Sequence, residues 1–264
     1  MNSEIRKAVI LARGLGTRMR AAGAGALSDE QAQAAATGVK AMVPVGRPFI
    51  EYQLSELADA GYVEICLVTG PEHQAVRNHC DQLPVERIRI RHAIQQEPRG
   101  TADAVAASAE FAGINEFLVI NSDNYYPLAA LRAARQLEGP GLIAFSARSM
   151  IEDAGVPGER VGTFPRVETD AEGSLVRLAP ASAVEEGYVS MNCWRFGPTI
   201  FSACDAIAPS PRGELELPEA VSYSMTRLGQ RYRALLSDDP VFDLSSRADI
   251  ARVTRQLDGV TVRL

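Results

Sequence analysis

A glycine-rich turn near the start of the chain has the composition of a phosphate-binding loop. Leu11 and Ala12 end an apolar run, and the segment 13–17 (RGLGT) follows it. Closely spaced glycines after a strand let backbone N–H groups approach an anion, and the N-terminus of the next helix adds a favourable dipole. The segment lacks the third glycine of the Rossmann fingerprint and is not a Walker A loop. By itself it is also compatible with an ordinary tight turn.

A lysine downstream of this turn is the second candidate. Of the 27 basic residues only Lys7 and Lys40 are lysines, so arginine supplies the general surface cations. Lys40 lies between a polar segment and the apolar residues 41–45, where a compact positive charge could neutralise a phosphate. The alternative is a lysine of the solvated surface.

Two aspartates could hold a divalent cation. Asp123 follows the apolar run 117–121, and open α/β sheets bind ligands at the carboxyl ends of their strands. Mg²⁺ prefers one or two carboxylates together with phosphate oxygens. Asp243 stands between apolar residues just before a helical segment and is the second candidate ligand. The competing roles are a turn or helix cap for Asp123 and N-terminal helix charge for Asp243.

A glutamine at the end of a predicted strand could read a nucleobase. Gln95 precedes a turn that leads through Gly100 and Thr101 into a helix. An amide side chain both donates and accepts hydrogen bonds, as recognition of a base edge requires. Without this context, Gln95 and the adjacent Gln96 would be residues of a polar loop.

Strand-like and helix-like segments alternate in the first half of the chain. We expect strands at 5–12, 63–68, 88–92, 117–121 and 142–147, and helices at 48–60, 72–80, 101–111 and from residue 127. Such alternation predicts an α/β fold with a mainly parallel sheet and helices on both faces. A hairpin at 166–178 and a strand at 188–196 predict a small antiparallel addition, followed by helices at 198–206, 218–228 and 246–257.

The chain is expected to form one domain over residues 1–264. Within it, the alternating strands and helices occupy 1–147, and the antiparallel addition lies in 148–264. Residues 21–38 are rich in Ala, Gly and Gln and read as an insert, in which Ser28 and Gln31 form the pattern of a helix-starting capping box. The insert could cover the site or be a tolerated surface excursion.

Composition limits the function classes. The 264 residues are 46% hydrophobic and 23% charged, with a net charge of −6, which is typical of globular proteins and too acidic for one that mainly grips nucleic acid. No apolar run approaches the ~18 residues of a membrane span. The first residues reach a strand too early for a secretion signal, and the cysteines lack zinc-ligand spacing. We therefore expect a cytoplasmic protein with no nucleic acid or membrane partner and no structural zinc.

Together these segments resemble the nucleotidyltransferase family that makes NDP-sugars from a nucleoside triphosphate and a sugar 1-phosphate. The matching motifs lie in the family order and span nearly the whole chain: Leu11-Ala12-x-Gly14-x-Gly16-Thr17-Arg18-Met19, Lys40-x-Met42-x-Pro44-Val45, Gln95 followed by Gly100-Thr101-Ala102, Ser122-Asp123, and Asp243. The resemblance implies a Rossmann-like nucleotidyltransferase fold, Mg²⁺ as cofactor and pyrophosphate as leaving group.

The resemblance also implies that 1–147 is the nucleotide-binding half and 148–264 the acceptor-binding half, and it implies a role for each matched residue. Arg18 would bind the leaving pyrophosphate, and Lys40 would contact the α-phosphate and the incoming phosphate. Asp123 and Asp243 would chelate Mg²⁺. The nucleotide itself would be bound by Leu11, Ala12, Gly14, Gly16, Thr17, Gln95, Gly100 and Thr101.

The acceptor side departs from the family pattern. The acidic-lysine-proline segment that usually contacts the sugar phosphate is missing, and Arg177 or Arg195 is the candidate substitute. Asn192 could bind a sugar hydroxyl and Trp194 could stack on the sugar ring, although Trp194 is equally compatible with the core. Arg13 stands where the family usually has Ala or Gly beside the nucleotide, which leaves the choice of base open.

These residues favour Mg²⁺-dependent transfer of a nucleotidyl group to a sugar 1-phosphate. One alternative is a non-sugar acceptor such as phosphocholine. Another is a nucleotide-binding regulatory subunit without turnover, against which the retention of Arg18, Lys40, Asp123 and Asp243 argues. The base, the sugar and the oligomeric state, including a homo-oligomer, are left open by the sequence.

Overall fold

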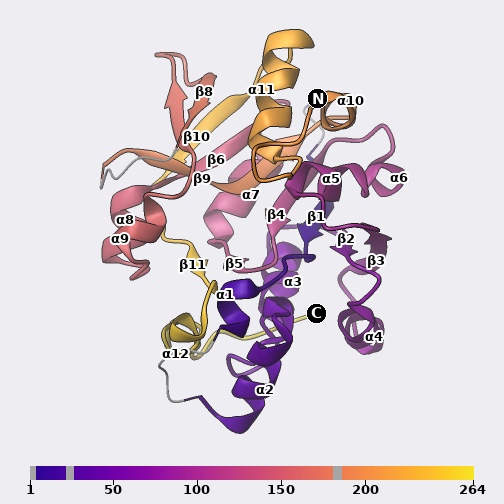
Figure 1. Cartoon of the computed structure of the whole chain (residues 1–264), viewed down its shortest axis with the longest axis vertical. Coiled ribbons are helices and arrows are strands. Elements are labelled where there is room, and N and C mark those ends of the chain that lie inside the picture. Colours follow the sequence, from indigo (N-terminus) through magenta and orange to yellow (C-terminus); the bar gives the residue numbers. More distant parts are fainter. Residues whose placement is uncertain (1–3, 22–26, 181–185) are drawn as a thin grey trace.

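A nine-stranded sheet runs through the centre of the computed structural model, which describes residues 4–21, 27–180 and 186–264 (Figure 1). Its main path has the order β10-β6-β9-β4-β1-β2-β3. The strands of this path are β1 Lys7–Leu11, β2 Glu64–Thr69, β3 Arg89–Ile94, β4 Phe117–Asn121, β6 Gly141–Ser146, β9 Tyr188–Phe196 and β10 Arg233–Ser237.

The strands are mainly parallel. β4, β1, β2 and β3 pair in parallel, as do β10 and β6, whereas β9 is antiparallel to both of its neighbours on the path. The hairpin of β7 Arg166–Thr169 and β8 Leu175–Ala179 joins the edge of β9. A separate two-residue ladder pairs β5 Asn124–Tyr125 with β11 Phe242–Asp243. The predicted mainly parallel sheet with a small antiparallel addition is confirmed.

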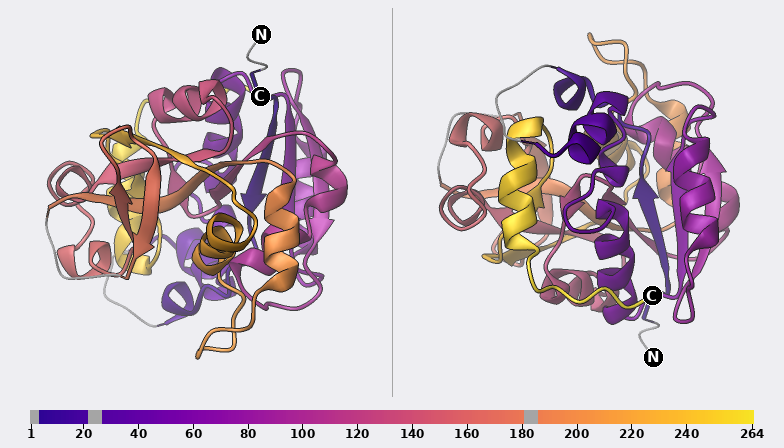
Figure 2. Two further views of the ribbon diagram at one scale, coloured as in Figure 1. Left: turned by 90° about the horizontal axis from the view of Figure 1, so that it is seen from above. Right: turned by 90° about the horizontal axis from the view of Figure 1, so that it is seen from below.

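Alternate side chains of β1 enter two different cores, because successive residues of a strand point to opposite faces. Ala8 and Ile10 pack in one cluster, and Val9 and Leu11 in the other. The first cluster is covered by α3 Phe49–Asp59, α4 Gln74–Gln82 and α7 Leu128–Gln136. The second is covered by α5 Thr101–Ala106, α10 Thr199–Ala206 and α11 Leu217–Arg227. Figure 2 shows α7 and the α10–α11 pair on opposite sides of the strands.

A third apolar cluster joins the insert to the end of the chain. It includes Met19 of α1 Thr17–Arg20, Ala35 of α2 Asp29–Thr37, and Ile250 of α12 Arg247–Gln256. The capping box of Ser28 and Gln31 is formed at the start of α2, as the sequence predicts. The described part of the insert therefore contributes to a core, while residues 22–26 lie outside the described part.

Several short elements have no counterpart among the expected segments. The helix expected at 101–111 is split into α5 and α6 Ala109–Ala112 at Ser108, whose hydroxyl donates to the Val105 carbonyl (2.7 Å). The strand β10, the β5–β11 ladder, and the short helices α8 Ala147–Glu152, α9 Gly158–Val161 and η1 Lys40–Met42 are the further additions. No described helix has the length and apolar character needed to cross a membrane.

Candidate active site

A pocket opens where the order of the sheet reverses. The chain runs from β1 outward to β2 and β3, and then returns to place β4 on the other side of β1. Ligands of open α/β sheets bind at such a switch point, beyond the carboxyl ends of the strands. The lining comprises Leu11, Ala12, Arg13, Gly14, Leu15, Val39, Lys40, Ala41, Gln95, Pro98, Gly100, Thr101, Ala104, Asn121, Ser122, Asp123, Asn192 and Glu214.

The glycine-rich loop contributes only its first part to this pocket. Gly14 and Leu15 line it, whereas Gly16, Thr17 and Arg18 do not. Gly16 instead serves close packing: its φ is +59°, and a Cβ there would lie 2.0 Å from the Gly38 carbonyl oxygen. Arg18 is exposed on α1 and makes no hydrogen bond to another described residue. Arg18 therefore lies outside the pocket lining, and its contact with the pyrophosphate stays a prediction.

Lys40 and Asp123 meet at the floor of the pocket. The Lys40 Nζ atom lies 2.8 Å from Asp123 Oδ2, and both side chains are half-buried. Helix η1 positions the lysine after the insert, and the turn between β4 and β5 positions the aspartate. The structure thus brings together two predicted site residues that are 83 positions apart in the chain.

Asp243 is close to this pair but is held in a different environment. It does not line the pocket and is only 2% exposed. Its Oδ2 atom pairs with Arg160 (2.7 Å), and its Oδ1 atom accepts hydrogen bonds from Asn124 and Ser245. Burial and the nearby charge of Asp123 raise the pKa of Asp243, against the lowering effect of Arg160 and Ser245.

The donor set fits Mg²⁺ at Asp123. The Oδ1 atom of Asp123 has no hydrogen-bond partner in the described part of the chain, and the residue faces the pocket. A carboxylate oxygen is the ligand type that Mg²⁺ takes together with substrate phosphates. The second predicted ligand, Asp243, is paired with Arg160 in this structure, and its role in metal binding stays a prediction. The same Arg160 nitrogen also donates to Asp249 (2.8 Å).

Gln95 is a buried amide of the pocket lining. It follows β3 and is 4% exposed, and its Nε2 atom donates to the Gly100 carbonyl (3.0 Å) and to Asp103 Oδ2 (2.8 Å). Gly100 has a φ of +114°, and a Cβ there would lie 2.4 Å from the Leu215 carbonyl oxygen. Thr101 accepts a hydrogen bond from the Leu217 backbone N–H (2.9 Å). These contacts join the turn after Gln95 to the start of α11.

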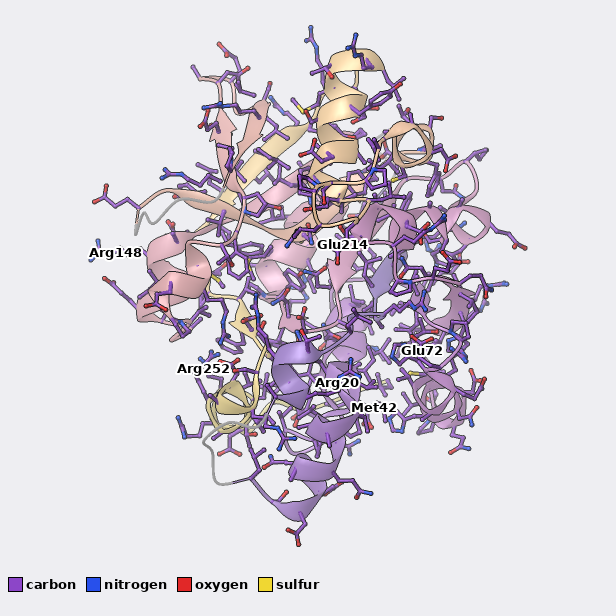
Figure 3. All side chains as sticks on the ribbon, viewed as in Figure 1. Arg20, Met42, Glu72, Arg148, Glu214 and Arg252 are labelled. Carbon is purple, nitrogen blue, oxygen red and sulfur yellow. The ribbon has the colours of Figure 1, made fainter. Side chains whose placement is uncertain are left out.

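Arg13 is part of the pocket wall, although its side chain is turned to a neighbouring loop. Its Nε atom lies 3.2 Å from Glu72 Oε1, and its side chain is 6% exposed. Glu72 stands just before α4 (Figure 3). The guanidinium therefore joins the carboxyl ends of β1 and β2 instead of reaching across the pocket.

Of the four expected acceptor-binding residues, Asn192 alone lines the pocket. It lies in a bulge of β9, where the register with β6 shifts, and has a φ of +58°. Asn tolerates this left-handed conformation better than most residues. Its Nδ2 atom donates to Asn121 Oδ1 (3.2 Å), which fixes it above the end of β4.

The other three acceptor candidates are corrected by the structure. Trp194 is 1% exposed and stacks on Phe196 (5.3 Å between ring centroids), because its position on β9 points into the core. Arg195 is 4% exposed and pairs with Glu116 (2.5 Å). Arg177 pairs with Glu168 (2.6 Å) on the β7–β8 hairpin, outside the pocket lining.

Glu214 and Arg160 are charged residues of the site that have no counterpart in the sequence-based set. Glu214, on the loop before α11 (Figure 3), lines the pocket, and Arg160 neutralises Asp243. In the sequence, the acidic stretch 214–219 resembles the acidic segment that precedes a helix in the family, but helix-start electrostatics explain it equally well. Arg160 carried no signal, because one arginine among many is not distinctive.

The family is decided by a match over most of the chain. The model of the nucleotidyl transferase family matches residues 7–240. The chain belongs to the nucleotidyl transferase family. The resemblance based on the motifs is thereby confirmed.

Individual members of the family show how far the likeness extends. The UTP–glucose-1-phosphate uridylyltransferase AglF of Haloferax volcanii is 25% identical over 264 residues, covering 97% of this chain and 98% of AglF. The low-salt glycan biosynthesis nucleotidyltransferase Agl11 of the same organism is 25% identical over 218 residues, covering 81% of this chain and 56% of Agl11. The chain thus spans about half the length of that relative.

A solved structure of the family shares the fold. UDP-glucose pyrophosphorylase complexed with UDP-glucose matches with a TM-score of 0.75 at 18% identity, over 96% of this chain and 98% of that chain. At this level of identity, the likeness extends to the architecture of the sheet and its helices and not to the substrates.

Proposed function

We propose that this protein transfers a nucleotidyl group from a nucleoside triphosphate to a sugar 1-phosphate and releases pyrophosphate, with Mg²⁺ as cofactor. The observation that carries the proposal is the Lys40–Asp123 contact in a pocket at the switch point of the sheet. A cation and a carboxylate side by side can receive a phosphate and a metal ion, respectively. The names of AglF and related enzymes support the substrate class.

The chemistry asks for alignment and charge neutralisation and little covalent participation by the protein. A sugar phosphate is ionised at neutral pH, so its oxygen can attack the α-phosphorus without a general base. Lys40 would neutralise charge on the α-phosphate and on the incoming phosphate. Backbone N–H groups of the loop at Gly14 would contact the triphosphate.

Magnesium would supply a Lewis acid that offsets the charge of the triphosphate. Asp123 is the residue that would hold it, through the oxygen that Lys40 leaves free. Asp243 remains the second candidate ligand if Arg160 leaves it for Asp249, which already accepts a hydrogen bond from the same nitrogen. Arg18 would join the pyrophosphate if α1 approached a bound nucleotide.

The acceptor would lie beside Asn192 and Glu214, the two lining residues from the second half of the chain. Asn192 and the carboxylate of Glu214 can hydrogen-bond hydroxyl groups, as a sugar acceptor requires. The interpretation of residues 148–264 as the acceptor-binding half stays part of the proposal.

A matrix of substrates tests this function. Purified protein with Mg²⁺ is given each common nucleoside triphosphate against a panel of sugar 1-phosphates and phosphocholine, and pyrophosphate is measured. We expect release with at least one triphosphate and a sugar 1-phosphate. Release with phosphocholine alone would change the acceptor, and nucleotide binding without release under every condition would favour a regulatory subunit.

A further inference from the structure

One buried amide holds both ends of the turn that carries Asp123. Gln53 lies on α3 and is 2% exposed. Its Nε2 atom donates to the carbonyls of Asn121 (2.9 Å) and Asn124 (2.5 Å). Asn121 is the last residue of β4 and Asn124 the first of β5, and Ser122 and Asp123 form the turn between them. Gln53 therefore bridges the two residues that flank the turn.

Among the described residues, the side chain of Gln53 hydrogen-bonds to this turn alone. Both facing atoms are carbonyl oxygens, so only the NH₂ end of the amide can meet them, with one N–H for each. The Oε1 atom is buried and has no hydrogen-bond partner within the described ranges. A buried acceptor without a partner is unfavourable. Gln53 thus pairs two acceptors beside the turn while its own acceptor stays unpaired.

Helix α3 supports both members of the Lys40–Asp123 pair. It contacts η1, which carries Lys40, and most residues of α3 are buried. Through Gln53 the same helix holds the turn of Asp123. The middle of this turn is held by backbone hydrogen bonds to Leu11 (3.1 Å) and Leu244 (2.8 Å). Loss of the Gln53 bonds should therefore shift the turn relative to α3 and η1 without unfolding it.

We propose that Gln53 is a positioning residue that sets the place of the Asp123 carboxylate beside Lys40. Gln53 does not line the pocket, so it acts through the turn and not on a ligand. A displacement of about 1 Å in an active site can lower a rate by about 100-fold, so the place of this carboxylate matters for the transfer. The inference rests on the proposed function for the part that Asp123 plays, and on the contacts alone for the position of Asp123.

The two lysines of the chain provide a test that needs neither nucleotide nor metal. Lys40 is paired with Asp123, whereas Lys7 donates to two backbone carbonyls at the end of α6 (2.8 and 3.1 Å). The folded protein is treated with substoichiometric acetic anhydride, and the ratio of Lys40 to Lys7 acetylation is measured by mass spectrometry. D123N, which removes the partner charge, gives the ratio for a released Lys40.

Gln53→Leu and Gln53→Met remove both donors and keep an apolar side chain of similar size. Each should raise the Lys40:Lys7 ratio toward that of D123N, by about threefold or more, because Lys40 loses its ion pair. An unchanged ratio in either folded variant would overturn the inference. If neither variant folds, hydrogen exchange of the wild-type protein decides: both Nε2 protons of Gln53 should exchange slowly in NMR spectra, and fast exchange would overturn the inference.

Tyr62→Phe is the matched control for a general loss of stability. It removes a hydrogen bond from a buried side chain to a backbone carbonyl, that of Leu131 (3.1 Å), and Tyr62 does not line the pocket. Urea unfolding should show a loss of stability in Tyr62→Phe as in Gln53→Leu. Only Gln53→Leu should change the acetylation ratio. An equal rise in Tyr62→Phe would show general loosening of the fold and contradict a specific role of Gln53.

Turnover separates this inference from the proposed function. In an active protein, Gln53→Leu should raise the Mg²⁺ concentration for half-maximal rate and lower kcat by about tenfold or more, while Tyr62→Phe keeps both. A wild-type protein without turnover, in which Gln53→Leu still releases Lys40, would overturn the proposed function alone. Turnover in the wild type with unchanged acetylation and kcat in Gln53→Leu would overturn the positioning role alone.

Discussion

The contact between Lys40 and Asp123 shows how two ordinary side chains become a candidate catalytic pair. From the sequence, Lys40 could equally be a solvated surface lysine, and Asp123 could equally be a structural turn residue. Their 2.8 Å separation and half-burial do not fit a solvated surface lysine, and Asp123 faces the pocket from the turn between β4 and β5. In this structure, each of the two charges is neutralised by the other.

Asp123→Asn tests the proposed metal ligand. The substitution keeps the size of the side chain and removes the charge that would hold Mg²⁺, so pyrophosphate release should fall by about 100-fold or more. Because the paired side chains are only 18% and 25% exposed, loss of the pair should also lower stability, and circular dichroism checks that the variant remains folded. Glu168→Gln, which breaks the exposed pair with Arg177, is the control and should retain activity. Wild-type rates in Asp123→Asn would exclude the metal role.

Lys40→Ala tests phosphate neutralisation. Loss of the cation should lower turnover by about 100-fold, because one donor aimed at developing charge contributes at this level. Lys40→Arg keeps the charge but changes its shape and should recover part of the rate. A Lys40→Ala protein with an unchanged rate would assign Lys40 to structure alone. Steady-state pyrophosphate release at saturating Mg²⁺ is the measurement.

At the scale of elements, the buried Asp249 of helix α12 connects that helix to the site, because it shares Arg160 with Asp243. Asp249 accepts hydrogen bonds from the Ser246 backbone and hydroxyl, from Arg160, and from Arg252, which is labelled on α12 in Figure 3. Burial acts to raise the pKa of Asp249, but these hydrogen bonds and charges outweigh it and hold the pKa below its usual value. Stability therefore depends on its ionised form.

Asp249→Asn should lower stability in a pH-dependent way. A depressed folded-state pKa contributes stability above the unfolded value of about 3.9, which is lost as the pH falls through the lower folded value. The variant should thus cost roughly 2 kcal/mol at pH 7 and progressively less below about pH 4. Urea unfolding from pH 7 to pH 3 measures this, and a penalty that stays constant over the range would contradict it.

The glycine-rich loop packs against the end of α2 through Gly16. Gly16→Ala places a methyl group 2.0 Å from the Gly38 carbonyl oxygen and forces a residue with Cβ into φ +59°. We expect a loss of about 2 kcal/mol or more in unfolding free energy. Gly14→Ala is the matched control in the same loop, because nothing lies within 4 Å of its Cβ and its φ is not positive. Equal stabilities of the two variants would contradict the packing role.

At the scale of the whole molecule, the pocket draws on both halves of the chain. Lys40 and Gln95 come from the first half, and Asn192 and Glu214 from the second. A ligand bound there contacts segments that are distant in sequence, so its binding should stabilise the native state as a whole.

A thermal shift with nucleotide measures this stabilisation. At 100 times its dissociation constant, a ligand adds about 2.7 kcal/mol, which corresponds to roughly 5–10 °C for a chain of this size. The matching triphosphate with Mg²⁺ should give such a shift, the free nucleoside much less, and chelation of the metal should reduce it. No shift with any triphosphate would remove the basis of the proposed site.

The sequence alone predicted the alternating strands and helices of the sheet, because the hydrophobic pattern that favours a strand or a helix is local. The apolar runs of β1 and β4 and the polar residues after them predict where those strands end and hence where a site lies. The sequence alone also shows that Lys40, Gln95 and Asp123 follow one another in the order typical of the family.

Only the tertiary structure decided which neighbours those residues have. Arg160 neutralises Asp243, Asp103 holds Gln95, and Trp194 turns into the core. A local pattern specifies an element and the spacing of its side chains, but a contact between distant residues depends on strand order, register and bulges. Strand order, register and bulges are determined by the packing of side chains on both faces of the whole sheet.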